Sequence, residues 1–134
     1  KIFTTAKKKF PKTKIQGILV QQMISGKELI IGGKKDLQFG QVIMFGLGGI
    51  YVEFIEDVVF RLVPIERIDA EEMLEEIKAT KLFNKSSKEG LVKILLKVSK
   101  FLEENQNVSE LDINPLMLSS KGIQAVDARI VLSD

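Results

Sequence analysis

The chain ends in two runs of alternating apolar and polar residues, at 110–118 and 123–129, which flank the turn Ser119-Ser120-Lys121-Gly122. Such alternation is typical of strands, and the turn residues between the runs predict a β-hairpin. One face of this hairpin is apolar apart from Gln124 and is expected to pack into a core. The apolar residues of that face are Leu111, Ile113, Met117, Val126, Ala128 and Ile130.

The other face of the hairpin carries charged and amide side chains. If the two middle turn residues form the loop, Asn114 lies opposite Asp127 and Asp112 lies opposite Arg129. A loop placed one residue later pairs Asn114 with Arg129 instead. In both registers all four side chains share one face, because side chains alternate with a period of two along a strand.

A carboxylate and an amide oxygen on one face of a sheet suit a hard cation. Mg²⁺ needs only one or two protein oxygens when nucleotide phosphates and water complete its octahedron. Asn114 and Asp127 are therefore candidate ligands of Mg²⁺. The alternative is structural, with Asp112 and Arg129 as a cross-strand ion pair and Asn114 capping a turn. The spacing of the residues leaves both interpretations open.

Four earlier runs rich in β-branched and aromatic residues predict strands, at 15–23, 27–33, 39–45 and 57–64. The first two flank Ser25-Gly26 and are expected to form a hairpin. Gly46-Leu47-Gly48-Gly49 precedes another strand-like run at 51–55, without the helix start that makes a glycine loop a phosphate cradle. These glycines are either a strand connection that needs positive φ or a loop that faces phosphate.

Two amphipathic helices are predicted between these strands and the final hairpin. The first begins at Asp69, an N-cap that forms a capping box with Glu72, and the second covers residues 88–104. Each helix has an apolar stripe and a full polar side, as expected of helices that cover one face of a sheet. The predicted fold class is therefore α+β, a mostly antiparallel sheet covered by two helices.

Residues 1–13 differ from the rest of the chain. Ile2, Ala6 and Phe10 have helical spacing before Pro11 ends the pattern, and no helix cap precedes them. We expect this segment to be the tail of a helix from a preceding lobe that the chain lacks. Residues 14–134 are expected to form one domain around a single core.

Composition narrows the possible chemistry. The sequence has no histidine and no cysteine, so the chain has no Ser-His or Cys-His catalysis, no thiolate nucleophile, no disulfide and no zinc ribbon of its own. A cytoplasmic setting is the default for a chain without cysteine. The apolar run at 42–52 is too short to cross a bilayer, and the lysines at 7–9 are typical of a solvated helix end. We therefore expect no membrane and no nucleic-acid partner.

Several sequence blocks resemble a known family. Leu-Asp-Ile-Asn-Pro-Leu at 111–116 and Ala-Val-Asp-Ala-Arg at 125–129 resemble the end of the ATP-grasp domain in ADP-forming acetyl-CoA synthetases, the nucleoside-diphosphate-forming acyl-CoA synthetases. The resemblance begins at about Gly17 and includes Met-Phe-Gly-Leu-Gly-Gly-Ile-Tyr-Val-Glu at 44–53. The β subunit of succinyl-CoA synthetase is similar more distantly. The resemblance implies the C-terminal lobe of an ATP-grasp domain.

The resemblance also implies where a nucleotide binds. Gln21, Gln22, Met23 and Ile24 correspond to the hinge between the two ATP-grasp lobes, where backbone groups of an extended chain contact the adenine edge. Glu28 corresponds to the family acid that accepts hydrogen bonds from the ribose hydroxyls. Without the resemblance, Glu28 is an ordinary exposed strand carboxylate.

The same resemblance assigns roles to the polar face of the hairpin. It makes Asn114 and Asp127 the Mg²⁺ ligands, and Asp112 the catalytic acid that orients a phosphohistidine supplied from elsewhere. The glycine loop at 46–49 and Glu53 are expected to face this site. The implied cofactors are Mg²⁺ and ATP or ADP, and the implied chemistry is phosphoryl transfer between a nucleotide and a histidine.

The implied protein is an enzyme, an acid-thiol ligase that couples acyl-CoA, ADP and phosphate to acid, CoA and ATP. The first lobe, the CoA-binding domains and the histidine would belong to a longer fused chain or a hetero-oligomer, so this chain alone is expected to be folded but inactive. The chain departs from the family at 82–87, where relatives tend to carry a glycine- and arginine-bearing segment. The alternatives are a non-catalytic or regulatory module of a protein acetyltransferase and a succinyl-CoA synthetase β subunit.

Overall fold

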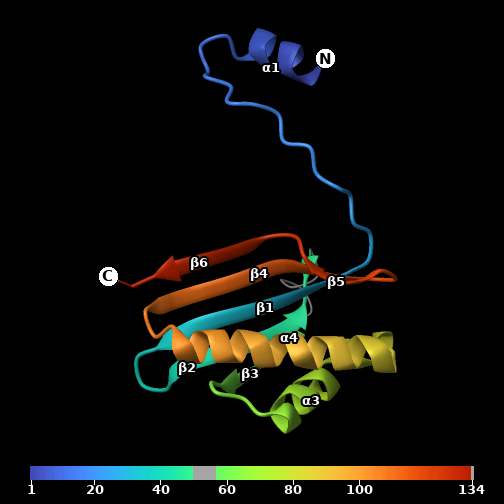
Figure 1. Ribbon diagram of the computed structural model, residues 1–134, viewed down its shortest axis with the longest axis vertical. Helices are drawn as coiled ribbons and strands as arrows, with labels where there is room; N and C mark the ends of the chain where they lie inside the picture. The colour runs from blue at the N-terminus through green and yellow to red at the C-terminus, as the bar shows by residue number, and fades with distance from the viewer. Residues whose placement is uncertain (50–56, 134) are drawn as a thin grey trace.

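The fold is an antiparallel sheet with two helices packed on one side (Figure 1). A computed structural model describes residues 1–49 and 57–133. The strands are β1 (Lys27–Asp36), β2 (Gly40–Leu47), β3 (Val58–Leu62), β4 (Val108–Ser119), β5 (Gly122–Ala125) and β6 (Ala128–Leu132), and the helices are α1 (Ile2–Lys9), α3 (Arg67–Glu76), the 3-10 helix η2 (Lys78–Leu82) and α4 (Lys85–Glu104). The sheet order is β3-β2-β1-β4-β5, and β6 also pairs with β4. The predicted α+β class is confirmed.

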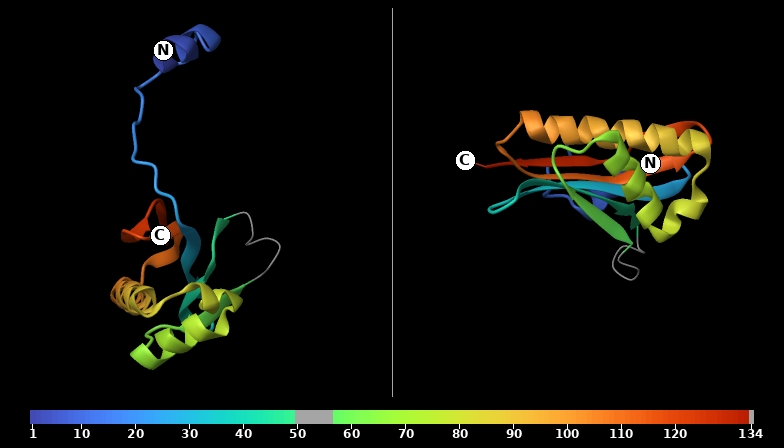
Figure 2. Two further views of the ribbon diagram at one scale, coloured as in Figure 1. Left: turned by 90° about the vertical axis from the view of Figure 1, so that its right-hand side faces the viewer. Right: turned by 90° about the horizontal axis from the view of Figure 1, so that it is seen from below.

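The two faces of the sheet differ in what covers them (Figure 2). Leu29 and Ile31 of the central strand β1 are fully buried in the core beneath the helices. A Cβ atom at Gly33 would lie 2.7 Å from Leu102 of α4, so Gly33 points toward the same side. The intervening residues point the other way, to a face that we call the open face. The open face carries Glu28, Gly32, Lys34, Glu110, Asp112 and Arg129.

Asn84 sets the start of α4. Its side-chain oxygen accepts a hydrogen bond from the backbone N–H of Ser87 at 2.9 Å, which satisfies one of the free donors at the helix N-terminus. The helix therefore begins at Lys85, earlier than the predicted residue 88. The buried side of α4 consists of Leu91, Val92, Leu95, Val98, Ser99 and Leu102.

The predicted start of α3 was wrong. Glu66, not Asp69, is the N-cap, and Asp69 is the third helical residue. The carboxylate of Asp69 accepts a hydrogen bond from the backbone N–H of Glu66 at 2.7 Å. The capping box is real but one turn earlier, because the buried Ile65 N–H donates to Ser99 Oγ of α4 and fixes where the chain turns into the helix.

A buried carboxylate closes the other end of this region. Asp57 is 6% exposed and accepts hydrogen bonds from the backbone N–H groups of Lys78 and Ala79, at 2.8 and 3.0 Å. These contacts cap the N-terminus of η2. Strand β3 begins directly after Asp57 and ends at Leu62, so it is shorter than the predicted run 57–64. The predicted strands at 27–33 and 39–45 correspond to β1 and β2.

The predicted strand at 15–23, and with it the first hairpin, is not formed. Residues 10–26 include no helix or strand, and most of their side chains are exposed. The reason is topological: β1 already pairs with β2 on one edge and with β4 on the other, so it has no free edge for the segment that precedes it. The strand-like run at 51–55 lies outside the described residues.

The N-terminal helix α1 stands away from the sheet at the end of this extended segment (Figure 1). It has no buried residue. Its assignment to the tail of a helix from another lobe stays a prediction, as does the boundary at residue 14. Among the described residues, no helix is both long enough and apolar enough to cross a membrane.

Candidate functional site

The final hairpin has the first of the two predicted registers. Ser119 pairs with Gly122, which leaves Ser120 and Lys121 as the loop. Further along, the backbone N–H of Asn114 donates to the carbonyl oxygen of Asp127 at 3.2 Å. The second run is split into β5 and β6, and Asp127 lies at the break between them.

The apolar face of the hairpin is only partly buried. Leu111 is buried in the core as expected, but Val126 and Ile130 are about half exposed, at 48% and 50%. Met117 is buried, but it pairs with Glu28 on the open face, because the register of β4 shifts between Ile113 and Leu116. The prediction that this whole face enters the core was therefore wrong. Val126 lies between β5 and β6 and Ile130 lies in β6, which pairs on one side with β4; among residues 1–49 and 57–133 no strand pairs with its other side.

Asn114 of β4 and Asp127 at the break between β5 and β6 are both exposed, and their backbones are in contact. One carboxylate oxygen of Asp127, Oδ1, accepts a hydrogen bond from the N–H of Ala128 at 2.9 Å, which leaves Oδ2 available for a ligand. Within residues 1–49 and 57–133, no group of three or more histidine, cysteine, aspartate or glutamate side chains could hold a metal ion. One carboxylate and one amide fit a hard cation that takes its remaining ligands from phosphate and water.

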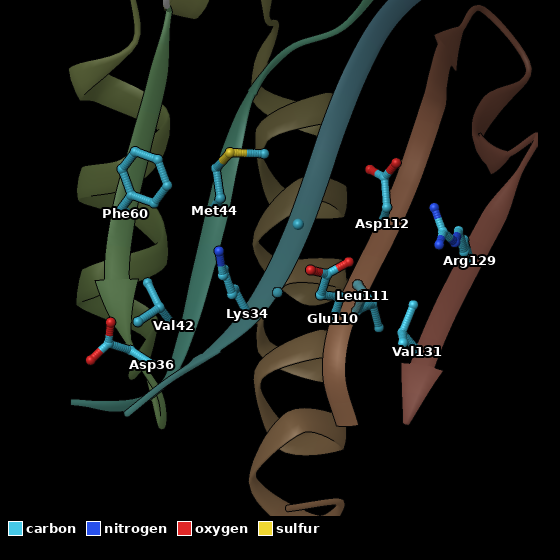
Figure 3. Close-up of a pocket in the computed structure, with 12 residues that line it drawn as sticks. Lys34, Asp36, Val42, Met44, Phe60, Glu110, Leu111, Asp112, Arg129 and Val131 are labelled. Atoms are coloured by element: carbon cyan, nitrogen blue, oxygen red, sulfur yellow. The ribbon is translucent and has the colours of Figure 1, made fainter. Parts of the chain in front are cut away.

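Asp112 and Arg129 are directly opposite each other on β4 and β6. Figure 3 shows both side chains on the open face, at the same end of a hollow. In the described part of the chain neither forms a salt bridge, so the predicted structural alternative of a cross-strand ion pair is not realised. The carboxylate of Asp112 is thus available to a ligand.

The hollow on the open face has a volume of about 500 Å³. One side is apolar and comes from β2 and β3, and the other side is charged and comes from β4 and β6 (Figure 3). Gly32 lies between Met44 and Asp112 on neighbouring strands, and its lack of a side chain keeps the middle of the hollow open. The residues around Gly32 are Lys34, Asp36, Val42, Met44, Phe60, Glu110, Asp112, Arg129 and Val131.

Glu28 lies against the glycine loop. The backbone N–H of Gly48 donates to the carbonyl oxygen of Glu28 at 2.8 Å. Gly49 has φ +75°, and a Cβ atom there would overlap with Oε2 of Glu28. The predicted need for positive φ is confirmed at Gly49. No pattern in the sequence indicates that this loop and Glu28 are in contact. Glu53 lies outside the described residues.

The predicted adenine-contacting residues are apart from this group. Gln22, Met23 and Ile24 line a separate hollow of about 290 Å³ beside the β4–β5 turn, and Met23 is 90% exposed. Gln21 is also exposed. In the described residues Asp112 and Asn114 lie two positions apart on β4 and the backbone of Asn114 contacts that of Asp127, whereas residues 21–24 belong to no strand.

Sequence reasoning missed two features of the open face. Arg129 was considered only as a structural partner of Asp112, although its side chain lines the hollow. Gly32 was placed near the end of the predicted strand 27–33 without any role in a site, although it lies in the interior of β1. A glycine inside a strand pattern is a signal of close approach by a ligand or another backbone, and that signal would have pointed to the hollow.

Comparisons with known proteins agree on one family. A family model described as an ATP-grasp domain matches residues 1–132. Acetate–CoA ligase [ADP-forming] I of Archaeoglobus fulgidus is 41% identical over 99% of this chain, and the chain covers 20% of that relative. Acetate–CoA ligase [ADP-forming] II subunit beta of Pyrococcus furiosus is 43% identical over 98% of the chain, and the chain covers 60% of it.

A solved structure is similar at the same level. It is the dinucleotide forming acetyl-coenzyme A synthetase 1 of Ca. Korarchaeum cryptofilum in complex with coenzyme A and Mg-AMPPCP, with its phosphohistidine segment pointing towards the nucleotide binding site. The TM-score is 0.75 at 43% identity, over 82% of this chain and 55% of that one. The chain thus matches only part of each of these proteins.

Proposed function

Because the chain belongs to the ATP-grasp domain family, we propose that it is the nucleotide- and Mg²⁺-binding part of an ADP-forming acetyl-CoA synthetase. The complete enzyme would convert acyl-CoA, ADP and phosphate to acid, CoA and ATP. The proposal is supported by relatives at 41% and 43% identity that are ADP-forming acetate–CoA ligases. Because these relatives are ADP-forming acetate–CoA ligases, they favour that enzyme class over a succinyl-CoA synthetase β subunit.

The reaction at this site would be phosphoryl transfer between ATP and a histidine. The lone pair of one imidazole nitrogen forms a bond to the γ-phosphorus of ATP, and the bond from that phosphorus to the bridging oxygen breaks. ADP leaves with the electron pair, and the reverse reaction makes ATP. Such transfer depends on positioning and on charge stabilisation more than on covalent help from the protein. A lobe without histidine is therefore chemically sufficient for this half of the reaction.

Asn114 and Asp127 would hold the metal. Mg²⁺ bound there would neutralise phosphate charge and orient the nucleotide. Their exposed oxygens, with one oxygen of Asp127 held by Ala128 N–H, are the observation that carries the proposal. Asp112, two residues from Asn114 along β4, would accept a hydrogen bond from the second imidazole nitrogen and orient the ring.

The nucleoside would lie toward the other end of β1. Glu28 would accept hydrogen bonds from the ribose hydroxyls, and the backbone of residues 21–24 would contact the adenine. The contact between Glu28 and Gly49 supports this placement, because it holds a carboxylate beside the glycine loop. In the structure residues 21–23 are exposed, Ile24 is half-buried and none of the four belongs to a strand, so this hinge would form only with the first lobe.

The chain would act as one part of a larger enzyme. A first ATP-grasp lobe, CoA-binding domains and a histidine-bearing segment would come from the same chain or from another subunit, in the cytoplasm. Residues 1–13 would then belong to a helix of the first lobe, and residues 14–134 would form the C-terminal subdomain. The isolated chain is expected to be folded but inactive.

Calorimetric titration of Mg²⁺ADP into the complete assembly tests the proposal. We expect Asn114→Ala combined with Asp127→Ala to lower the affinity by more than about tenfold, since both protein ligands of the metal are lost. EDTA should lower the wild-type affinity and leave that of the double variant unchanged. Glu103→Gln, on the exposed side of α4, is the matched control and should bind as wild type does. Equal binding by wild type and double variant would refute the metal site.

A further inference from the structure

Arg129 occupies a distinctive position on the open face. It is the direct cross-strand neighbour of Asp112, and it lies two residues after the candidate metal ligand Asp127. Its guanidinium lines the same hollow as the Asp112 carboxylate (Figure 3). Residues directly opposite on antiparallel strands share a face, and their Cβ atoms are about 5 Å apart. A group bound by Asp112 is therefore within reach of Arg129.

The other two arginines of the sequence, Arg61 and Arg67, form salt bridges within the protein. Arg61 contacts Glu72 and Glu76 of α3, and Arg67 contacts Glu71 and Glu89. Both lie on the side of the sheet that the helices cover. By contrast, no salt bridge involving Arg129 occurs among residues 1–49 and 57–133.

The hollow leaves room in front of this guanidinium. Gly32 has no side chain, and its position on β1 is directly opposite Asp112. The apolar side of the hollow, which includes Met44 and Phe60, could contact the body of an incoming ring. An imidazole held by Asp112 would therefore enter from the hollow, with its reacting nitrogen toward the metal site.

We propose that Arg129 binds the non-bridging oxygens of the phosphoryl group while it moves between the nucleotide and the histidine. This inference rests on the proposed function. As the N–P bond forms and the P–O bond to ADP breaks, negative charge spreads over three oxygens of the phosphoryl group. A planar guanidinium can donate two parallel hydrogen bonds to such oxygens, which a lysine ammonium cannot.

The rate of histidine phosphorylation by Mg²⁺ATP, measured in a single turnover of the complete assembly, tests the role of Arg129. We expect Arg129→Gln to slow transfer by about 100-fold, as is typical when one donor to a developing charge is removed. Arg129→Lys should restore part of the rate because it keeps the charge. The affinity for Mg²⁺ADP should change by less than about threefold, because ADP lacks the moving group. Arg67→Gln, an exposed arginine on the helix side, is the control and should transfer at the wild-type rate.

Two outcomes would overturn the role of Arg129. One is wild-type transfer by Arg129→Gln while the Asn114→Ala, Asp127→Ala variant is inactive, which leaves the proposed function intact. The other is an equal loss of Mg²⁺ADP affinity and transfer rate, which makes Arg129 a nucleotide-binding residue. Failure of the wild-type assembly to phosphorylate its histidine would overturn the proposed function, and the inference with it.

A measurement without turnover is possible on the 134-residue chain. The Nε–H signals of Arg61, Arg67 and Arg129 can be assigned in an NMR spectrum with single Arg→Lys variants. Phosphoramidate, which carries the same N–P bond as phosphohistidine, should shift the Arg129 signal in the presence of Mg²⁺. The signals of Arg61 and Arg67 should stay, and sulfate should produce a smaller shift. An Arg129 signal that does not move, or three signals that move together, would contradict the proposal.

Discussion

At the scale of single residues, the contact between Glu28 and Gly49 joins two parts of the candidate site. Gly49 serves it in two ways: its φ of +75° lies in the left-handed region, and its missing side chain leaves space for the Glu28 carboxylate. An alanine at this position would satisfy neither requirement. It would be strained in the backbone, and it would push the carboxylate away.

We expect Gly49→Ala to lower the free energy of unfolding by about 1 kcal/mol, because of the positive φ. It should also weaken Mg²⁺ADP binding by about tenfold, the equivalent of one hydrogen bond to a charged group. Urea unfolding and calorimetry in the complete assembly measure the two effects separately.

Gly40→Ala is the matched control for this variant. Gly40 has φ +78°, but no atom lies within 4 Å of a Cβ placed there. Gly40→Ala should lower the free energy of unfolding by the same amount and keep the wild-type affinity for Mg²⁺ADP. If both variants bind alike, the contact of Glu28 with Gly49 has no role in nucleotide binding.

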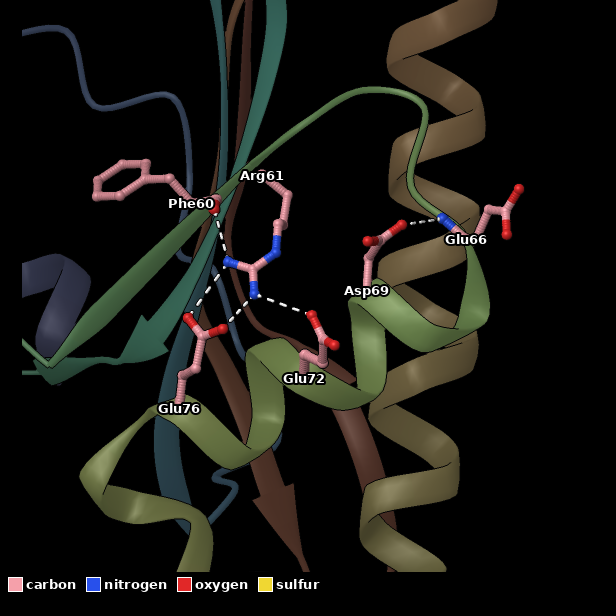
Figure 4. A network of polar contacts seen from close by, with 6 residues as sticks. All are labelled: Phe60, Arg61, Glu66, Asp69, Glu72 and Glu76. Carbon is pink, nitrogen blue, oxygen red and sulfur yellow. Dashed lines mark hydrogen bonds and ion pairs between the residues drawn. The ribbon is translucent and has the colours of Figure 1, made fainter.

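At the scale of elements, Arg61 attaches β3 to α3. Its guanidinium donates to the carboxylate of Glu76, with one contact at 3.2 Å, and lies 3.5 Å from Glu72 (Figure 4). The hydrogen bond from Arg61 lowers the pKa of Glu76 below its ordinary value of 4.5, and the same pair raises the pKa of Arg61. Helix α3 thereby holds the strand whose Phe60 lines the hollow on the other face.

The contribution of this ion pair depends on pH. A carboxylate with a lowered pKa in the folded state stabilises the fold above pH 4.5, and the effect is lost as the pH falls through the lowered pKa. We expect Glu76→Gln to lower the Tm by about 2 °C at pH 7, a small effect because the side chain is half exposed. The difference from wild type should disappear toward pH 3.

Thermal unfolding between pH 7 and pH 3 measures this difference. Glu103→Gln, which removes an exposed acid of α4, should show no comparable pH-dependent difference. A Glu76→Gln difference that is the same at both ends of the range would mean that the ion pair does not stabilise the fold.

At the scale of the whole molecule, the chain consists of a packed body and an N-terminal extension. The core lies between the sheet and the helices α3 and α4, whereas α1 has no buried residue. Residues 14–25 form no helix or strand. Their exposed apolar side chains, such as Leu19 at 79% and Val20 at 88%, are those of a strand without a partner.

Deletion of residues 1–13 is therefore expected to change the free energy of unfolding of the chain by less than about 0.5 kcal/mol. In the 134-residue chain the amides of residues 14–25 should exchange rapidly with solvent, and in the complete assembly they should be protected. Urea unfolding and hydrogen exchange measure these effects. A large loss of stability on deletion, or strong protection of 14–25 in the chain alone, would mean that the extension packs on the body.

Local patterns were sufficient for most elements of the body. The helix at 88–104 and the strands at 27–33 and 39–45 were recognisable from periodicity and turn residues, because these depend on neighbouring residues. The start of α3 was placed wrongly, because Glu66 becomes its N-cap only when the buried Ile65 N–H donates a hydrogen bond to Ser99 Oγ on α4. The strand at 15–23 was placed wrongly for a similar reason, since its sequence is strand-like but both edges of β1 are occupied.

The sequence by itself determined the register of the final hairpin, and with it the pairing of Asp112 with Arg129, because both follow from the two-residue repeat of a strand and the position of one turn. That Asn114 and Asp127 share their face stays a prediction. The resemblance to a family was likewise readable in short ordered blocks. Only the tertiary structure decided that Glu28 meets Gly49, that Arg129 faces a hollow beside Gly32, and that Arg61 does not. These outcomes depend on which strands lie side by side and on which face the helices cover. Such contacts join residues far apart in the chain, so no local pattern specifies them.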